Sequence, residues 1–290
     1  MFSNTTYHSV IIGGGISGLS ASIRLAEAGK RVLLIESQNS LGGKIKTTNK
    51  LGVLTEEGPD ELIIGYKKFD ALLIRANVLN NLIHPEKTKF YIFARNKLRE
   101  FPYSLISGIP SFKLKDIYEV ISSGILSPFG YLRAMMEPLF KINNLKGDIS
   151  IRELFERKFG SEFTKNIIDP LFGGIMGADI SMISAKSYIP YIYNAVKDGK
   201  SLITHFSKRR EAGHFEIAST ASGLSGVIDG LRDYAEKIGV KIAIGTAADS
   251  IEKSSNGWSI NAGNEIIKCD RLVLAVPSYV ASKLIRTVDK

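Results

Sequence analysis

The sequence predicts an α/β protein in which a glycine-rich strand–helix–strand unit is interrupted by a mainly helical region. The chain opens on VIIGGGISG (10–18) and reaches VLLIE at residues 32–36. A helical pattern without glycine–strand alternation then follows, and strand patterns return near the end. We place the interrupted domain at 1–70 and 216–290 and the helical insertion at 71–215. A chain of 290 residues is long enough to form both.

The first unit carries the pattern of a dinucleotide site. Val10–Ile12 is a short apolar run that predicts a buried parallel strand. The motif G-x-G-x-x-G follows at Gly13, Gly15 and Gly18. In this motif the first glycine allows a tight turn, the second lets a pyrophosphate approach the backbone, and the third lets helix and strand pack closely. The helix predicted over Ile16–Ala28 would direct its N–H groups and positive dipole end at the phosphates.

An acid completes the pattern. Glu36 stands at the carboxyl end of the second predicted strand, Arg31–Ile35. Its carboxylate can accept both ribose hydroxyls of a dinucleotide and would repel a 2′-phosphate, which disfavours NADP. Strand, glycines, helix, strand and acid occur in the required order, so a glycine-rich turn without a ligand is the weaker alternative.

The residues after Glu36 distinguish FAD from NAD. A second glycine pair, Gly42–Gly43, and the adjacent Lys44 offer further N–H groups and a cation beside a diphosphate. Gly58–Pro59 predicts a rigid turn where a flat ring system could lie against the backbone. Together these features indicate FAD.

The wording GGKI…GPD resembles the amine-oxidase-like flavoprotein superfamily, and within it the bacterial type of protoporphyrinogen and coproporphyrinogen oxidases. The stretches FPYSLISGIP (101–110) and IRELFERKFGSEFTKNIIDPLFGGIMGADISMIS (151–184) are similar to the same family. The resemblance implies a Rossmann-like two-nucleotide FAD-binding domain with an inserted helical region that faces substrate or membrane. It also implies oxidation of protoporphyrinogen IX or coproporphyrinogen III to the porphyrin in heme biosynthesis, with O2 reoxidising the flavin.

The same resemblance implies roles for single residues. It places the backbone of Ala248 against the adenine, the backbone of Gly174 near the substrate, and Lys89 opposite a propionate. We name no catalytic acid or base, because the flavin accepts the hydride. The four histidines are scattered and predict neither a metal site nor a catalytic triad. The predicted cofactor-binding residues are Gly13, Gly14, Gly15, Ile16, Ser17, Gly18, Glu36, Ser37, Gly42, Gly43, Lys44, Gly58, Pro59, Asp60, Glu61 and Ala248.

Helices dominate the middle of the chain. Ser150 and Glu153 have the spacing of a capping box, and Gly160 is placed to end the helix that they open. A second helical pattern continues as far as Pro170. The apolar stretch 116–140 has two interpretations that the sequence leaves open. It forms a buried helical pair, or it rests on a membrane or lines an apolar cavity.

The last part returns to strands. A helix with Ile228, Leu231, Ala235 and Ile238 on one face precedes a predicted strand over 240–244. Asn256–Gly257 predicts a hairpin within a small antiparallel meander. Residues 272–276 then predict a buried strand that ends at Pro277.

Composition narrows the location and the partners. The first residues lack a basic start and an apolar run, and no run of about 20 apolar residues occurs, so we expect a cytoplasmic protein without a spanning helix. Membrane association through 116–140 stays open. The net charge is +9, but no zinc spacing or RNA-binding signature accompanies it, so nucleic acid is not an expected partner. The single cysteine, Cys269, is expected to be a buried bystander.

Two alternatives remain at this point. An amine oxidase or carotenoid desaturase would share the first 60 residues, although the GPD turn and 151–184 argue against both. The oxidases that the sequence resembles are about half as long again. We therefore expect a chain truncated at its C-terminus, and a non-catalytic fragment or paralogue is the second alternative.

Overall fold

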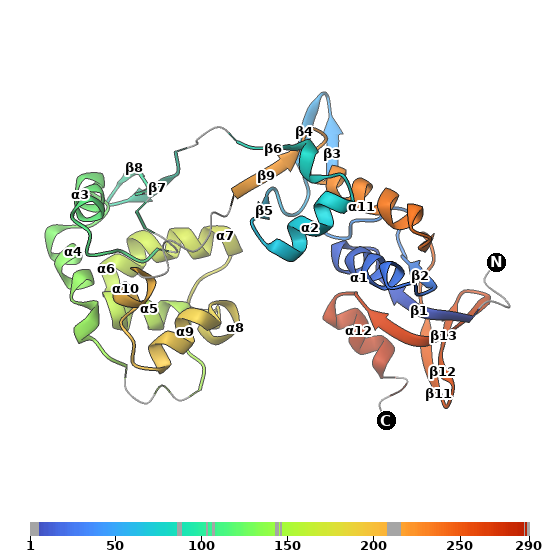
Figure 1. The fold of residues 1–290 in the computed structure, drawn as a ribbon. Helices are drawn as coiled ribbons and strands as arrows, with labels where there is room; N and C mark the ends of the chain where they lie inside the picture. The colour runs from blue at the N-terminus through green and yellow to red at the C-terminus, as the bar shows by residue number, and fades with distance from the viewer. Residues whose placement is uncertain are drawn as a thin grey trace. The chain divides into compact units, whose positions relative to one another are not determined.

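The chain divides into two compact units (Figure 1). The sheet unit comprises Met1–Glu86 and His214–Lys290, and the helical unit comprises Lys87–Gly213. The first boundary falls after residue 86 and not after residue 70 as predicted. The reason is α2 (Lys67–Arg75), whose buried Leu72 and Leu73 pack into the core of the sheet unit. The computed structural model describes residues 6–85, 89–102, 104–105, 108–142, 145, 147–207, 216–286 and 288.

A six-stranded sheet forms the centre of the sheet unit, in the order β10-β2-β1-β13-β12-β11. The first four strands pair in parallel, and β13, β12 and β11 form an antiparallel meander. All four residues of β2 are buried, as expected for a parallel strand that is covered on both faces. The strands are β1 (Thr6–Ile12), β2 (Val32–Ile35), β10 (Lys241–Ala243), β11 (Ser250–Ser254), β12 (Gly257–Ala262) and β13 (Glu265–Leu274).

The two faces of this sheet belong to two separate hydrophobic cores. Ile11 of β1 joins α1 (Ile16–Glu27) and α11 (Ser225–Lys237) in one core. Its neighbours Val10 and Ile12 join the other core, to which α12 (Ser278–Ile285) contributes Leu284. This alternation follows from the period of two along a strand.

Smaller sheets complete the sheet unit. β3 (Thr47–Lys50) and β4 (Val53–Glu56) form a hairpin. β9 (Glu216–Thr220) pairs with both β5 (Leu62–Ile64) and β6 (Leu82–Ile83), so the returning chain is joined to its first segment.

The helical unit is built around stacked aromatic rings. Phe159 stacks on Phe155 and on Phe163, with centroid separations of 5.8 and 4.7 Å. All three rings are buried. The elements are β7 (Tyr91–Ala94), β8 (Lys97–Glu100), α3 (Leu114–Ser123), α4 (Pro128–Met135), η2 (Glu137–Leu139), α5 (Ile151–Phe159), α6 (Ser161–Phe163), η3 (Thr164–Gly173), α7 (Gly174–Met176), α8 (Ala185–Tyr188), α9 (Pro190–Lys197) and α10 (Leu202–Ser207).

The predicted helix start at Ser150 is confirmed, but only one half of the capping box forms. The Ser150 hydroxyl accepts a hydrogen bond from the Glu153 N–H at 3.1 Å. The Glu153 carboxylate pairs instead with Arg157, one turn further on. The helix ends where Gly160 takes a φ of +92°.

The prediction that the next helix ends at Pro170 is wrong. η3 is a π-helix that runs through Pro170 to Gly173, and α7 continues it. Proline lacks an N–H and its ring crowds the carbonyl four residues earlier in an α-helix. The i→i+5 pairing of a π-helix is the local change that lets the chain continue.

The stretch 116–140 forms most of α3, all of α4 and the short helix η2, but the prediction of a buried pair holds only for the inner sides of α3 and α4. Val120 and Ala134 are buried. Tyr118, Phe129 and Leu139 are 75%, 84% and 74% exposed. Within the described ranges, no helix is both long enough and apolar enough to cross a bilayer.

The meander differs from its prediction in two details. Ser254 pairs with Gly257, so the loop consists of Ser255 and Asn256 and lies one residue earlier than predicted. The end of β13, predicted to be buried, is half-buried at Leu272 and Leu274. Among the described residues this end pairs with β1 on one side and with no strand on the other. Cys269 is buried and unpaired as expected, and burial raises the pKa of its thiol to about 11.

Candidate functional site

A cleft of about 680 Å³ opens at the carboxyl ends of β1 and β2. In open α/β sheets this is the edge at which ligands bind. Residues from both predicted glycine segments line it, together with Glu36, Lys44 and Ala248. The structure therefore brings together residues that lie far apart in the sequence.

The three glycines of the motif differ in what surrounds them. A Cβ at Gly18 would lie 1.8 Å from the Gly13 carbonyl oxygen, and one at Gly13 would lie 2.5 Å from that of Ala275. A Cβ at Gly15 would meet only the Gly42 carbonyl oxygen, at 3.8 Å. Gly13 and Gly18 are thus required by the packing of the chain itself, whereas the space beside Gly15 belongs to the cleft.

The N-terminus of α1 faces the same space. Gly15 is its N-cap and supplies no side-chain cap, and the first turn carries no acidic residue. The first N–H groups of a helix have no partner within the helix and carry the positive end of its dipole. Ile16 and Ser17 line the cleft, and Lys44 adds a cation to the lining. This arrangement suits an anion such as a diphosphate.

Glu36 is tied to the glycine loop. One carboxylate oxygen accepts the Gly14 N–H at 2.6 Å, and the other accepts the Gln38 N–H at 2.8 Å and the Ser37 hydroxyl at 3.1 Å. A carboxylate has about four acceptor positions, and three are used here, so about one is left for a ribose hydroxyl and not the two that the sequence predicts. The side chain is 8% exposed. The sequence predicts only the ribose contact of Glu36. It does not predict this second role, in which Glu36 holds the glycine loop through the Gly14 N–H.

The second glycine pair packs against the first. The Gly42 N–H donates to the Gly14 carbonyl at 3.0 Å. A Cβ at Gly43 would lie 3.4 Å from the Gly15 Cα, and one at Gly58 would lie 2.0 Å from the Lys44 carbonyl oxygen. The close backbone contact at Gly58 keeps the predicted turn beside the second glycine segment. Pro59, Asp60 and Glu61 follow it but do not line the described cleft.

A third wall was not predicted. Val276 and Pro277 line the cleft from the turn between β13 and α12, and Tyr279 lines it from the first turn of α12. β13 runs parallel to β1 in the register Ile12↔Leu274, so its end reaches the same edge of the sheet. The strand signal that ends at Pro277 could have placed this turn at the site.

The two predicted substrate residues lie in the helical unit. Gly174 follows the π-helix, and a Cβ there would have no atom within 4 Å. Its neighbour Ile175 is 69% exposed. The Lys89 ammonium lies 2.8 Å from the Glu100 carboxylate and is thus engaged in an ion pair.

An ion-pair network closes the turn that follows Gly174. Arg152 Nη2 lies 3.4 Å from Asp169 Oδ2 and 3.1 Å from Asp179 Oδ1. The pKa of Asp179 is lowered to about 2, mainly by a hydrogen bond from the Ser181 backbone N–H, and further by the Ser181 side chain and by Arg152. Asp179 therefore stays ionised, and the turn stays tied to α5, at neutral pH.

Comparison with known proteins places this cleft in context. The family model of flavin-containing amine oxidoreductases matches residues 16–289. The coproporphyrinogen III oxidase of Bacillus subtilis (strain 168) is 28% identical over an alignment of 292 residues, gaps included, that covers 96% of this chain and 61% of that protein. The coproporphyrinogen III oxidase of Staphylococcus aureus (strain NCTC 8325 / PS 47) is 32% identical over 286 residues, with 93% and 60% covered. The chain thus spans about 60% of the length of these relatives.

Solved structures show the same fold. A crystal structure from Exiguobacterium sp. 255-15 superimposes with a TM-score of 0.73 at 22% identity and covers 97% of this chain and 62% of that one. At this identity the likeness concerns the fold alone.

Proposed function

The chain belongs to the flavin-containing amine oxidoreductase family, and from this premise we propose that it binds FAD in the cleft and serves oxidation of a porphyrinogen. The observation that carries the proposal is the open space at Gly15, which faces the uncapped N-terminus of α1 within the cleft. We further propose that O2 accepts the electrons and that the protein acts in the cytoplasm.

The residues present suit the cofactor. The diphosphate would lie beside Gly15, where the cleft is open because glycine has no side chain. The N–H groups of the helix and Lys44 would offset its negative charge there. Glu36 would accept a ribose hydroxyl with its remaining acceptor position. Ala248 lines the cleft without a polar side chain and would lie against the adenine.

The protein's part in the reaction is binding and orientation. When bound, FAD supplies a hydride acceptor. The glycine loop fixes the cofactor, and the ties from Glu36 to Gly14 and Gln38 keep that loop in place. Gly174 is the substrate residue to test first, because its surroundings are open, whereas the Lys89 ammonium is engaged by Glu100.

The substrate class rests on the relatives. The two described above are named for coproporphyrinogen III, so we propose coproporphyrinogen III or the closely similar protoporphyrinogen IX. A chain that binds FAD without turnover, or not at all, is the competing proposal, since the chain covers about 60% of these relatives. The colour of the purified protein with added FAD separates these cases.

We expect a porphyrinogen, added without oxygen to the FAD-loaded chain, to bleach the flavin absorbance. A primary amine such as putrescine should leave the absorbance unchanged. Admitting O2 should restore the yellow colour and release hydrogen peroxide. Bleaching by the amine and not by the porphyrinogen would assign the chain to the amine oxidases. A yellow protein that neither compound bleaches would contradict porphyrinogen oxidation by this chain.

Replacing Glu36 with alanine is expected to weaken FAD binding by about 1.5–3 kcal/mol, the contribution of a hydrogen bond to a charged group. The loss has two sources, the ribose contact and the support of the Gly14 N–H. Titration of FAD against protein fluorescence measures it. Glu252→Ala removes an exposed acid from β11 and should leave the affinity unchanged. Equal affinities of the Glu36 variant and the parent chain would show that Glu36 does not contribute to FAD binding.

A further inference from the structure

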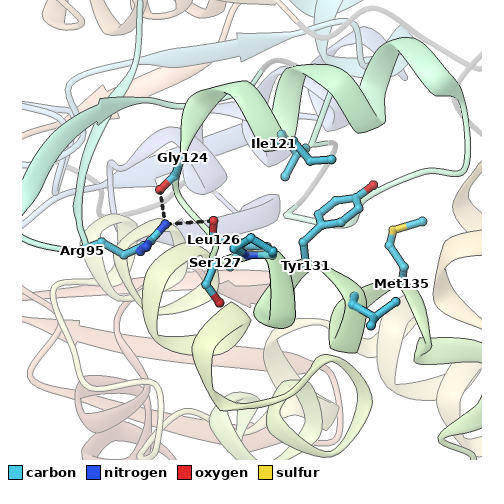
Figure 2. Close-up of a pocket in the computed structure, with 10 residues that line it drawn as sticks. Arg95, Ile121, Gly124, Leu126, Ser127, Tyr131 and Met135 are labelled. Carbon is cyan, nitrogen blue, oxygen red and sulfur yellow. Dashed lines mark hydrogen bonds between the residues drawn. The ribbon is translucent and has the colours of Figure 1, made fainter.

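A second cavity lies within the helical unit, between α3 and α4 (Figure 2). Its volume is about 460 Å³, within the range of about 300–1,000 Å³ that is typical of small-molecule sites. Its walls are mainly apolar and come from both helices and the loop that joins them. The apolar lining residues are Val120, Ile121, Leu126, Pro128, Leu132 and Met135.

One cation stands at one end of this cavity. Arg95, at the turn of the β7–β8 hairpin, donates from Nη1 to the carbonyl oxygens of Gly124 and Leu126, at 3.2 and 3.1 Å. Both bonds use one nitrogen of a guanidinium that carries five N–H donors. Within the described part of the chain, Arg95 forms no ion pair with a carboxylate, and Arg95 is the only charged residue of the lining. The guanidinium is therefore held in place and its charge is not balanced there.

Tyr131 forms the wall between the two helices. Figure 2 shows its ring beside Ile121 and its hydroxyl directed away from Arg95. The hydroxyl is shielded from solvent and has no hydrogen-bond partner among the described residues. Burial, with a smaller contribution from the Asp116 charge, raises the pKa of Tyr131 to about 12. The phenol stays neutral at physiological pH, so no lining residue carries a charge at this end of the cavity.

We propose that this cavity binds one molecule of an aliphatic carboxylate, with the carboxylate on Arg95 and the chain between α3 and α4. A guanidinium matches a carboxylate in shape and charge. A single cation also suits a head group with one negative charge better than a head group with several. The aliphatic walls suit an unbranched chain, and each further methylene that they bury should raise the affinity about fourfold. The site lies in the helical unit and does not depend on the flavin.

Calorimetric titration of the full chain tests this, with decanoate, octanoate and decyltrimethylammonium below their micelle concentrations and decanol below its solubility. We expect decanoate to bind in a saturable 1:1 manner. Octanoate should bind more weakly because its chain is two methylenes shorter. Decanol and the cationic amphiphile should bind at least about fivefold more weakly than decanoate, because neither pairs with Arg95. Absence of saturable binding, or equal affinity for the three head groups, would overturn the proposal.

Matched variants locate the site. Arg95→Gln should weaken decanoate binding about fivefold or more, whereas Lys97→Gln, which removes an exposed cation from the same hairpin, should not. Ile121→Asp places a carboxylate in the lining and should abolish binding, whereas Tyr118→Asp on the same helix, outside the lining, should not. Ile121 and Tyr118 are 55% and 75% exposed, so both variants should fold.

The alternative is that the exposed apolar side chains of α3 and α4 rest on a membrane. Cosedimentation with vesicles of anionic phospholipid distinguishes it from a single bound amphiphile. Two results together would overturn the proposed cavity site and show a surface that rests on a membrane. In the first, Ile121→Asp and Tyr118→Asp weaken vesicle binding equally. In the second, Arg95→Gln and Lys97→Gln have the same affinity for decanoate.

Discussion

Replacing Gly15 with valine is expected to abolish FAD binding while the chain still folds. The Gly15 backbone is extended, with φ −72° and ψ 178°, which any residue can adopt. A Cβ there would touch nothing closer than the Gly42 carbonyl oxygen at 3.8 Å. The added side chain would occupy the space that the diphosphate needs beside the N-terminus of α1. The affinity should fall at least about a hundredfold, because the clash and the lost N–H contacts act together.

Two further glycine variants make this result specific. Gly18→Ala should lower the thermal stability of the chain, because its Cβ would lie 1.8 Å from the Gly13 carbonyl oxygen. Gly174→Val adds a side chain in open surroundings in the helical unit and should bind FAD as the parent chain does. Flavin fluorescence and thermal unfolding report binding and folding separately. Unchanged FAD affinity in Gly15→Val would refute the assignment of the diphosphate to this cleft.

The elements that the sequence predicts well are those fixed by neighbours in the chain. The first strand, the glycine turn, the helix from Ile16 and the second strand depend on apolar runs and on glycines within about 30 residues. The cap at Ser150 and the break at Gly160 are equally local. Such signals are reliable because they depend only on the conformation of each residue and on its neighbours within a few positions in the sequence.

The features that were missed depend on contacts between distant residues. The wall of the cleft at Val276 and Pro277 exists because β13 pairs with β1, more than 250 residues earlier in the chain. Glu36 holds Gly14 across the turn, which no pattern of residue types reveals.

The helical unit shows the same limit. The apolar residues 116–140 indicate helices correctly, but not which side of each helix the unit covers. The passage of the π-helix through Pro170 likewise depends on the surrounding fold, since the local rule for proline predicts a break.

Replacing Lys158 with methionine is expected to destabilise the helical unit by about 3–5 kcal/mol, the usual cost of breaking a buried ion pair. Lys158 and Glu137 are 2% and 0% exposed and form an ion pair. The Lys158 ammonium also donates to the Phe140 carbonyl oxygen at 2.9 Å. Removing it would leave the Glu137 carboxylate buried without its cation. Urea unfolding followed by circular dichroism measures the loss.

Glu137 links three parts of the helical unit, and this explains why the effect should be large. Its carboxylate accepts the Ser201 hydroxyl at 2.7 Å and the Leu202 N–H at 3.0 Å, at the start of α10. Lys158 belongs to α5, so the pair joins η2, α5 and α10. The double variant Lys158→Met with Glu137→Gln should recover part of the stability, since no unpaired charge is then buried. Arg157→Gln, which breaks the exposed Arg157–Glu153 pair, should cost only about 0.3–0.5 kcal/mol. If Lys158→Met costs no more than Arg157→Gln, the buried pair does not hold these three elements together.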